Sequence, residues 1–370
     1  MSNRLRSWFV VISLIMVVAL AACTAQPTAA PGGEPAAPGE GEAACQYEAP
    51  FTIGVSNSFV GSEWRTQMIS NMQEVNEQYK AQGLTTDLVI ENADVDLQGQ
   101  TQQIRNLINR GVDAIIVNPG DAAGLNPVIQ EAVDAGIIVI SVDQEVSAQG
   151  AINVVIDQAE WARMSARWLV EQLGGEGNVV MINGVTGHPA NEARVRGATE
   201  VFEEAGITIL NSVEGMWDEA TGQQRMADML ASYPNINGVW AQDGVALGAL
   251  HAVQAANPDP WPVMVGEARQ AYVAEWWNIL QEKPDFQSFG VINPPGIGAD
   301  GLKVAVRLLQ CRELRDGLLA GEHGNTIYVP IPGVVDNSNI EQVYQEIGDK
   351  PAGFTMDQML TDEEIDAFFK

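Results

Sequence analysis

The sequence predicts an α/β protein built from two doubly wound, parallel-sheet domains. Three observations point to this class: short apolar runs alternate with longer stretches of helical spacing, the apolar runs are continuous, and about ten such pairs follow one another. Continuous apolar strands joined by helices are typical of parallel sheets covered on both faces. About ten strand–helix units exceed one compact sheet of ordinary size, so we expect two domains.

The expected strands are short and rich in β-branched residues. They lie at 51–57, 86–91, 113–118, 137–142, 152–156, 178–183, 207–213, 238–242, 262–266 and 286–292. The expected helices between them lie at 64–81, 98–110, 124–135, 159–173, 190–205, 221–232, 244–256, 269–281 and 298–319. Several are followed by a glycine suited to a left-handed cap, namely Gly83, Gly111, Gly136 and Gly206.

Residues 1–22 carry the pattern of a secretory signal peptide. Arg4 and Arg6 precede an apolar run of 14 residues, 9–22, which is shorter than the roughly 18 residues of a membrane span. The run ends in Leu-Ala-Ala-Cys, which resembles the bacterial lipobox, where the cysteine (here Cys23) is acylated. An ordinary secretory peptide with an incidental Cys23 remains the alternative.

Residues 23–46 are expected to form a flexible, lipid-anchored linker. They consist largely of Pro, Ala, Gly, Thr and Glu and cannot bury enough surface to order themselves. The other cysteines are Cys45 and Cys311, and such a pair is readily oxidised outside the cytoplasm. We expect a disulfide that ties the start of the folded part to a late helix, with two free thiols as the alternative. Because there is no Cys/His cluster, no metal site is expected.

The net charge is strongly negative. Without residues 1–22, 17 basic and 48 acidic residues remain, which gives a net charge of −31. Such a surface repels nucleic acid and anionic lipid and favours solubility. We therefore expect no nucleic-acid partner, and the lack of a basic helix-turn-helix start also argues against a repressor.

The candidate binding residues follow the expected strands, because open parallel sheets bind ligands beyond the carboxyl ends of their strands. Carboxylates and amides pair with hydroxyl groups, arginine supplies a fork of donors, and tryptophan faces suit the C–H faces of a sugar ring. Each strand-end Asp or Asn has an alternative role as the N-cap of the next helix. The residues are Ser62, Glu63, Trp64, Asn118, Asp121, Asp143, Gln144, Asp157, His188, Asn191, Arg194, Arg196, Trp217, Asp218, Asp243, Glu267 and Asn293.

At these residues the chain resembles the periplasmic sugar-binding proteins of the ribose-binding type, which are the solute receptors of ABC transporters. The resemblance covers roughly residues 50–335, and the matching segments keep the family's order. They are IGVSNSFVGSEWRTQM, DAIIVNPGDAAGLNPVIQEAVDAGIIVISVD, NGVTGHPANEARVRGATEVF, NGVWAQDGVALGALHAVQA and VMVGEARQAYV.

The resemblance implies a ligand-binding role for seven positions. Trp64 would supply a stacking aromatic ring and Trp217 a second one, and Asn118 would supply an amide. Asp143 would supply an aspartate, Arg196 the arginine just before a glycine, and Asp243 an acceptor. Asn293 would make a contact on a return crossing.

Two departures from the ribose binders bear on the ligand. Gln144 stands where those proteins have arginine, and Gly266-Glu267-Ala268 replaces their Gly-Phe-Asp motif, which makes Glu267 an eighth candidate contact. These departures argue against ribose itself. A pentose, a deoxyhexose or a related polyol remains open.

The resemblance also implies the fold of a type I periplasmic binding protein, with two discontinuous lobes joined by a three-crossing hinge. We expect crossings near 144–157, 293–296 and 325–335. The expected first lobe is 47–156 plus 294–326, and the expected second lobe is 157–293 plus 327–370.

The expected function is capture of a sugar by hinge closure, since a ligand that contacts both lobes favours the closed state. The resemblance implies delivery to the permease of an ABC transporter by a monomeric, extracytoplasmic lipoprotein anchored through Cys23. A receptor that presents its ligand to a sensor kinase or chemoreceptor would use the same site and remains the alternative.

An enzyme is the competing class. Residues 296–301 fit G-x-G-x-x-G, but Pro294 and Pro295 interrupt the turn, and no acidic residue on a following strand completes a dinucleotide site. None of the three histidines has a metal-binding spacing, and no G-x-S-x-G motif occurs. We expect neither catalysis nor a cofactor.

Overall fold

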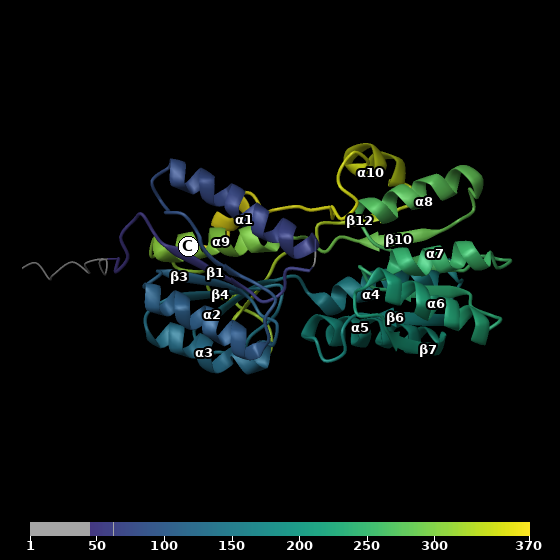
Figure 1. Cartoon of the computed structure of the whole chain (residues 1–370), viewed down its shortest axis with the longest axis horizontal. Helices are drawn as coiled ribbons and strands as arrows, with labels where there is room; N and C mark the ends of the chain where they lie inside the picture. The colour runs from purple at the N-terminus through teal and green to yellow at the C-terminus, as the bar shows by residue number, and fades with distance from the viewer. Residues whose placement is uncertain (1–44, 62) are drawn as a thin grey trace, which may run out of the picture. The chain divides into compact units, whose positions relative to one another are not determined.

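The computed structural model describes residues 45–61 and 63–370, which fold into two α/β lobes (Figure 1). The predicted signal peptide, the acylation site at Cys23 and the linker up to residue 44 lie outside the described residues, as does Ser62. Within the described residues, no helix combines the length and the apolar character needed to cross a bilayer.

The first lobe contains a six-stranded parallel sheet in the order β11-β5-β4-β3-β1-β2. Helices α1 and α9 cover one face of this sheet, and α2 and α3 cover the other (Figure 1). The strands are β1 (Ile53–Asn57), β2 (Val89–Asn92), β3 (Ala114–Asn118), β4 (Ile138–Val142), β5 (Ile152–Val155) and β11 (Thr326–Tyr328). The helices are α1 (Glu63–Ala81), α2 (Leu97–Arg110), α3 (Ala122–Asp134) and α9 (Ile297–Leu309).

The second lobe repeats this plan in the order β12-β10-β9-β8-β6-β7, and only β12 is antiparallel to its neighbour. Helices α4 and α5 pack on one face, and α6, α7 and α8 pack on the other. The strands are β6 (Asn178–Asn183), β7 (Thr208–Glu214), β8 (Gly238–Ala241), β9 (Val263–Val265), β10 (Ser288–Val291) and β12 (Val334–Asp336). The helices are α4 (Gln158–Gln172), α5 (Pro189–Ala205), α6 (Glu219–Ser232), α7 (Ala246–Ala256), α8 (Gln270–Glu282) and α10 (Ile340–Ile347). The last helix of the chain, α11 (Asp362–Asp366), packs on α9 of the first lobe.

The hydrophobic pattern explains this layering. Every residue of β1, β3 and β8 is buried, as expected for strands covered on both faces. The four predicted cap glycines all adopt positive φ, between +67° and +80°, which confirms these helix ends. The predicted helix 298–319 is wrong in its second half. The helix ends at Leu309, because Cys311 is left-handed and residues 314 and 315 instead pair with Phe369 and Phe368.

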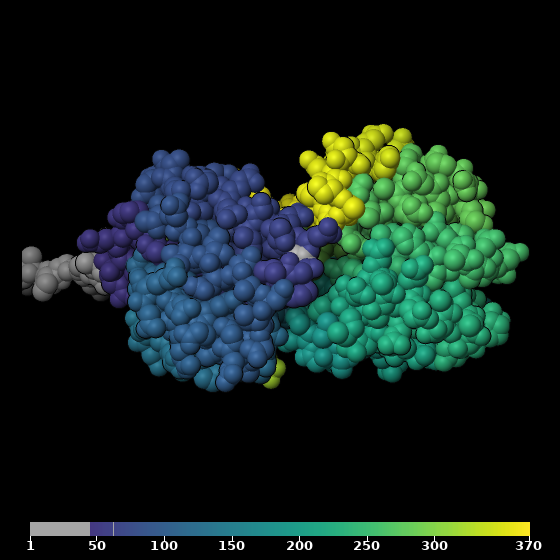
Figure 2. Space-filling model, viewed as in Figure 1, coloured from purple at the N-terminus to yellow at the C-terminus, as the bar shows by residue number. Residues whose placement is uncertain are grey.

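Four crossings join the lobes, one more than expected. Three follow β5, β10 and β11, within the predicted ranges. The fourth carries the chain end back to the first lobe, where α11 packs on α9 and Ile365 and Phe369 are buried (Figure 1). The prediction that 327–370 belongs wholly to the second lobe is therefore wrong. Figure 2 shows the yellow surface of the α10 region beside the green residues of the second lobe.

The glycines of the G-x-G-x-x-G segment serve helix packing. A Cβ at Gly298 would lie 2.6 Å from Cγ of Met68 in α1, and a Cβ at Gly301 would lie 2.5 Å from Cγ1 of Val142 in β4. The segment begins α9 directly after a lobe crossing, so it does not form the strand–turn–helix unit of a dinucleotide site.

Cys45 and Cys311 form a disulfide with an S–S distance of 2.05 Å. The bond joins the first described residue to the segment that follows α9, so the prediction of a bonded pair holds and the free-thiol alternative does not. Nearby, the hydroxyl of Tyr47 donates to the carbonyl of Gly136 at 2.9 Å. The start of the folded part is thus fastened to the first lobe at two places.

Candidate ligand-binding site

Asn118 ends β3 with a buried side chain that has an unused acceptor. Its Nδ2 lies 3.3 Å from Sδ of Met68, and its Oδ1 has no hydrogen-bond partner. A buried polar atom without a partner costs free energy. The Oδ1 atom is therefore suited to accept a hydrogen bond from a ligand hydroxyl.

Asp143 follows β4 in a left-handed conformation with φ +68°. Its carboxylate accepts from Nε2 of Gln144 at 3.0 Å. Burial raises the pKa of Asp143, whereas the positive charges of Arg65 and Arg194 oppose this shift. Gln144 also joins the lobes, because its Oε1 accepts from the backbone N–H of Ala190 at 3.1 Å. The glutamine that replaces the family's arginine thus holds the start of α5 near Asp143.

The first turn of α1 contributes two side chains. Trp64 donates from Nε1 to the carbonyl of Asn293 at 2.8 Å, so only its ring remains for a ligand. Arg65 is buried and donates to Oδ1 of Asn57 at 2.7 Å, and its burial lowers its pKa. Sequence reasoning missed Arg65. The sequence feature that could have indicated Arg65 is a cationic residue in the first turn of a predicted helix, where the helix dipole favours acidic residues.

Arg194, and not the predicted Arg196, is the arginine of this cluster. Two positions on a helix differ by about 200°, so the two side chains point to opposite faces of α5. Arg196 is exposed, whereas Arg194 is buried and donates from Nε to Oε1 of Gln158 at 2.7 Å. Its guanidinium also lies 4.1 Å from the centre of the Trp161 ring. Arg194 therefore takes the place in the cluster that was expected for Arg196.

Asp243 and Asn293 are brought together with Arg194. Nη1 of Arg194 lies 2.5 Å from Oδ1 of Asp243, and Nδ2 of Asn293 lies 3.5 Å from Oδ2 of the same carboxylate. Asp243 follows β8, and Asn293 lies on the crossing after β10. The cluster thus reaches from the second lobe to the crossing that carries the partner of Trp64.

Trp217 is held by Gln242 and Gly184. Its Nε1 donates to Oε1 of buried Gln242 at 2.9 Å, and a Cβ at Gly184 would lie 2.1 Å from Cε2 of the ring. Gln242 in turn donates to Oδ1 of Asn191 at 2.9 Å, and the same oxygen accepts from the N–H of Gly184 at 2.8 Å. The ring is therefore oriented by the protein before any ligand arrives.

His188 lies edge-on to Trp217, with ring centres 4.7 Å apart. Its Nδ1 is buried without a hydrogen-bond partner. Burial, assisted by the charges of Arg65 and Arg194, lowers the pKa of His188 to about 4. The imidazole is therefore neutral at physiological pH and can exchange a hydrogen bond with a ligand.

Glu267 lies beside this cluster with its carboxylate already engaged. It accepts from the backbone N–H of Gly244 at 2.8 Å and pairs with Arg269 at 3.0 Å. These contacts hold the turn that carries Asp243, so Glu267 supports the site without an oxygen to spare. Three further strand-end aspartates accept from backbone N–H groups at the start of the next helix, so they have the alternative role of N-cap residues. They are Asp121, Asp157 and Asp218.

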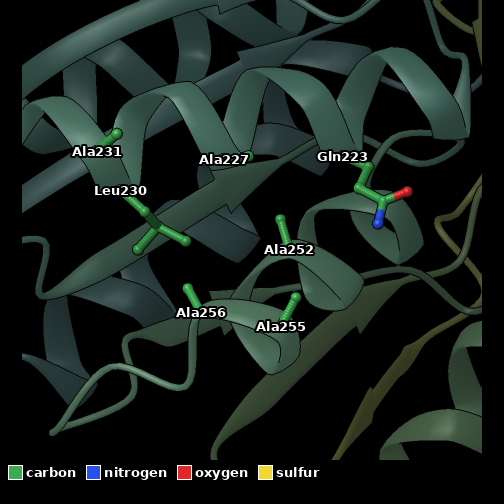
Figure 3. Close-up of a pocket in the computed structure, with 7 residues that line it drawn as sticks. All are labelled: Gln223, Ala227, Leu230, Ala231, Ala252, Ala255 and Ala256. Atoms are coloured by element: carbon green, nitrogen blue, oxygen red, sulfur yellow. The ribbon is translucent and has the colours of Figure 1, made fainter.

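A surface hollow of about 450 Å³ lies between α6 and α7, away from these polar residues. Figure 3 shows that its lining consists of small alkyl side chains and one amide. The lining extends to Ala255 and Ala256 at the C-terminal end of α7, whereas the polar cluster lies at the helix N-termini. This hollow therefore contributes nothing to the polar site.

The charges of the polar cluster balance. Arg65 and Arg194 are matched by Asp143 and Asp243, and His188 is neutral. Orphaned atoms on Asn118 and His188 add unused hydrogen-bonding capacity from both lobes. Such an arrangement suits an uncharged ligand with several hydroxyl groups.

Comparison with known proteins identifies the family. The model of the periplasmic binding protein domain matches residues 53–313. The chain belongs to this periplasmic binding protein family. Two curated relatives are the ribose import binding protein of Bacillus subtilis, 27% identical over 212 residues, and the D-ribose/D-allose-binding protein of Pseudomonas aeruginosa, 30% identical over 199 residues. The matches cover 56% and 52% of this chain and 67% and 60% of those relatives.

A solved relative extends the likeness to both lobes. The ABC transporter solute binding protein from Thermobispora bispora superposes on this periplasmic binding protein with a TM-score of 0.73 at 25% identity. The superposition covers 86% of this chain and 94% of that one. The predicted type I fold, with two lobes of largely parallel sheet, is thereby confirmed.

Proposed function

We propose that this periplasmic binding protein captures a small, uncharged sugar or polyol between its lobes and delivers it to an ABC transporter permease. The charge-balanced cluster that includes the orphaned Oδ1 of Asn118 carries the proposal. The two curated relatives are named for binding ribose or allose, which supports the same ligand class. A pentose, a deoxyhexose or a related polyol is the expected ligand.

The proposed contacts come from both lobes. Asn118, Asp143 and Arg65 of the first lobe would bind hydroxyl groups. Arg194, Asp243 and His188 would do so from the second lobe, with Asn293 between them. The rings of Trp64 and Trp217 would cover C–H faces of the ligand. A ligand that bridges these groups favours the closed arrangement by its differential affinity.

Thermal-shift screening of the full chain against sugars, polyols, nucleosides and amino acids tests this proposal. A ligand at 100-fold over its Kd stabilises the folded state by about 2.7 kcal/mol, which is a visible shift. A hit among pentoses, deoxyhexoses or polyols that disappears in Arg194→Ala supports the proposal. Hits confined to nucleosides or amino acids would overturn the ligand class.

We further propose that the mature protein is an extracytoplasmic, monomeric lipoprotein acylated on Cys23. The cysteine directly follows the apolar run 9–22 and its small residues, which supports this assignment. Mass spectrometry of the membrane-extracted protein should find the acyl chains on Cys23. Cys23→Ser should release the protein into the soluble fraction, and continued membrane retention of that variant would contradict the anchor.

A further inference from the structure

The fourth crossing, residues 355–359, begins firmly attached to the second lobe. Phe354 accepts at its carbonyl from the N–H of Gln270 at 2.8 Å, and the N–H of Met356 donates to the carbonyl of Ala268 at 2.9 Å. Between them, Thr355 forms an antiparallel bridge with Arg269. Thr355 is therefore bound to move with the second lobe.

Two residues later the same segment is attached to the first lobe. Oδ1 of Asp357 accepts from the N–H of Gly296 at 2.8 Å, and Oδ2 accepts from Nδ2 of Asn71 at 2.5 Å. Further along, the N–H of Leu360 donates to Oδ1 of Asp300 at 2.9 Å. The change from one lobe to the other thus takes place at Met356.

Gln67 of α1 reaches across this change. Its Nε2 donates to the carbonyl of Thr355 at 2.9 Å, and its Oε1 accepts from the N–H of the same residue at 3.1 Å. The side-chain amide thus pairs with both backbone polar groups of one residue on the other lobe. Gln67 lies three residues after Trp64, one helical turn away on the same side of α1.

A neighbouring contact also holds α1 against the second lobe. The side chain of Glu63, also on α1, fills the space above Gly353, where a Cβ would lie 1.6 Å from Oε2. The charge of Glu63 also acts on Arg269 of the second lobe. Burial opposes ionisation of Arg269, but the carboxylates of Glu267, Glu219 and Glu63 together raise its pKa. One side of the first turn of α1 is thus attracted to the second lobe.

We propose that Gln67 is a positioning residue that latches the two lobes through Thr355. Each lobe holds its own part of the segment without Gln67, so the loss of this side chain leaves both lobes intact and alters only the relation between them. The latch keeps the first turn of α1, with Trp64 and Arg65, opposite the second-lobe side chains. Its consequence for ligand capture rests on the proposed function, but the latch itself does not.

The distance between the lobes in the ligand-free protein tests the latch. Nitroxide labels are placed at Asn109→Cys on α2 and Glu204→Cys on α5, both exposed, in the full chain carrying Cys23→Ser so that no other free thiol is present. Pulsed electron–electron double resonance then gives the distribution of distances between the two labels. In Gln67→Ala the share of molecules at the wild-type distance should fall, with a roughly tenfold change in the ratio of latched to unlatched molecules, because two hydrogen bonds are lost.

Two variants accompany this measurement. In the wild type, Nε2 of Gln67 also lies 3.4 Å from Oδ2 of Asp357. Gln67→Glu keeps an acceptor for the N–H of Thr355 but repels its carbonyl and the Asp357 carboxylate, so it should shift the distribution at least as far. Gln73→Ala removes an exposed amide from the same helix and should leave the distribution unchanged. Thermal melting of each variant checks that the lobes remain folded. A distribution in Gln67→Ala that equals the wild type would overturn the latch, whether or not a sugar ligand is found.

Discussion

The guanidinium of Arg194 lies 2.5 Å from the carboxylate of Asp243 and stacks 4.1 Å from the centre of the Trp161 ring. Arg194→Ala would leave the side-chain carbonyl of Gln158 without its partner and this carboxylate with only the 3.5 Å contact from Asn293. We expect a loss of ligand affinity on the order of 2–4 kcal/mol, since truncation of a buried, hydrogen-bonded charge pair has this effect. Calorimetric titration with the ligand found by screening measures the loss.

Arg196→Ala is the matched control, because this arginine is exposed on the same helix. Its affinity should equal that of the wild type. An affinity of Arg194→Ala equal to that of the wild type would contradict the ligand contact, and equal losses in both variants would remove the distinction between the two arginines.

The hydrogen bond between Trp217 and Gln242 predicts an energetic coupling. Gln242→Leu removes the acceptor of the indole N–H inside a buried network and should lower the free energy of unfolding by about 1–2 kcal/mol. In a Trp217→Phe background the indole N–H is absent, so the same substitution should cost less. A double-mutant cycle from urea unfolding measures the difference, and a coupling near zero would argue against an oriented ring.

Because burial lowers the pKa of His188, we expect the folded protein to lose stability in acid. Its folded pKa of about 4 lies below the value of about 6.5 for an unfolded histidine, so the unfolded state binds more protons between these values. The contribution to stability is complete above pH 6.5 and is lost as the pH falls towards 4. Over this window His188→Asn should flatten the pH dependence of the unfolding free energy by about 2 kcal/mol. An unchanged slope would contradict a buried, neutral imidazole.

Asp300 should have the opposite effect on the pH dependence of the unfolding free energy. Burial raises the pKa of Asp300 to about 7, above the unfolded value near 3.9, so the folded state binds the extra proton. Its contribution is present below pH 4 and is lost as the pH rises through 7. Asp300→Asn should therefore become more stable relative to the wild type as the pH rises from 4 to 8, as unfolding by urea at each pH would measure. A relative stability that is constant over this range would refute the shifted pKa.

The disulfide predicts a measurable stabilisation. Thiol labelling of the denatured, unreduced protein should leave Cys45 and Cys311 unlabelled. The Cys45→Ser, Cys311→Ser double variant should lose roughly 2–5 kcal/mol of stability, as measured by urea unfolding. Two labelled thiols in the unreduced wild type would contradict the bond.

The order of strands and helices could be predicted because each strand is a continuous apolar run and each helix keeps its spacing. Helix ends could be predicted where a glycine forms the cap, as at Gly111 and Gly206. The end of α9 could not, because the segment after the left-handed Cys311 pairs through residues 314 and 315 with Phe369 and Phe368. Pairing between segments more than 50 residues apart leaves no local pattern in the sequence. The fourth crossing was missed for the same reason.

The candidate site could be predicted to the level of strand ends but not of side-chain direction. Asn118, Asp143 and Asp243 follow directly from their places after β3, β4 and β8. The choice between Arg194 and Arg196 depends on which face of α5 is buried, and the apolar pattern of this short segment does not settle it. Glu267 was expected to bind ligand because its segment replaces the Gly-Phe-Asp motif of the ribose binders. Nothing in the sequence shows that Arg269 and the turn at Gly244 engage its carboxylate.

The Cys45–Cys311 bond also determines how the protein carries mechanical tension. Cys45 is covalently joined to the residue two positions beyond α9, so a pull on the preceding chain passes through the sulfur atoms into the first lobe. Residues 46–52 and strand β1 lie outside this path and bear no tension. A force applied at the N-terminus would therefore leave β1, the strand that supports Asn57, unstretched.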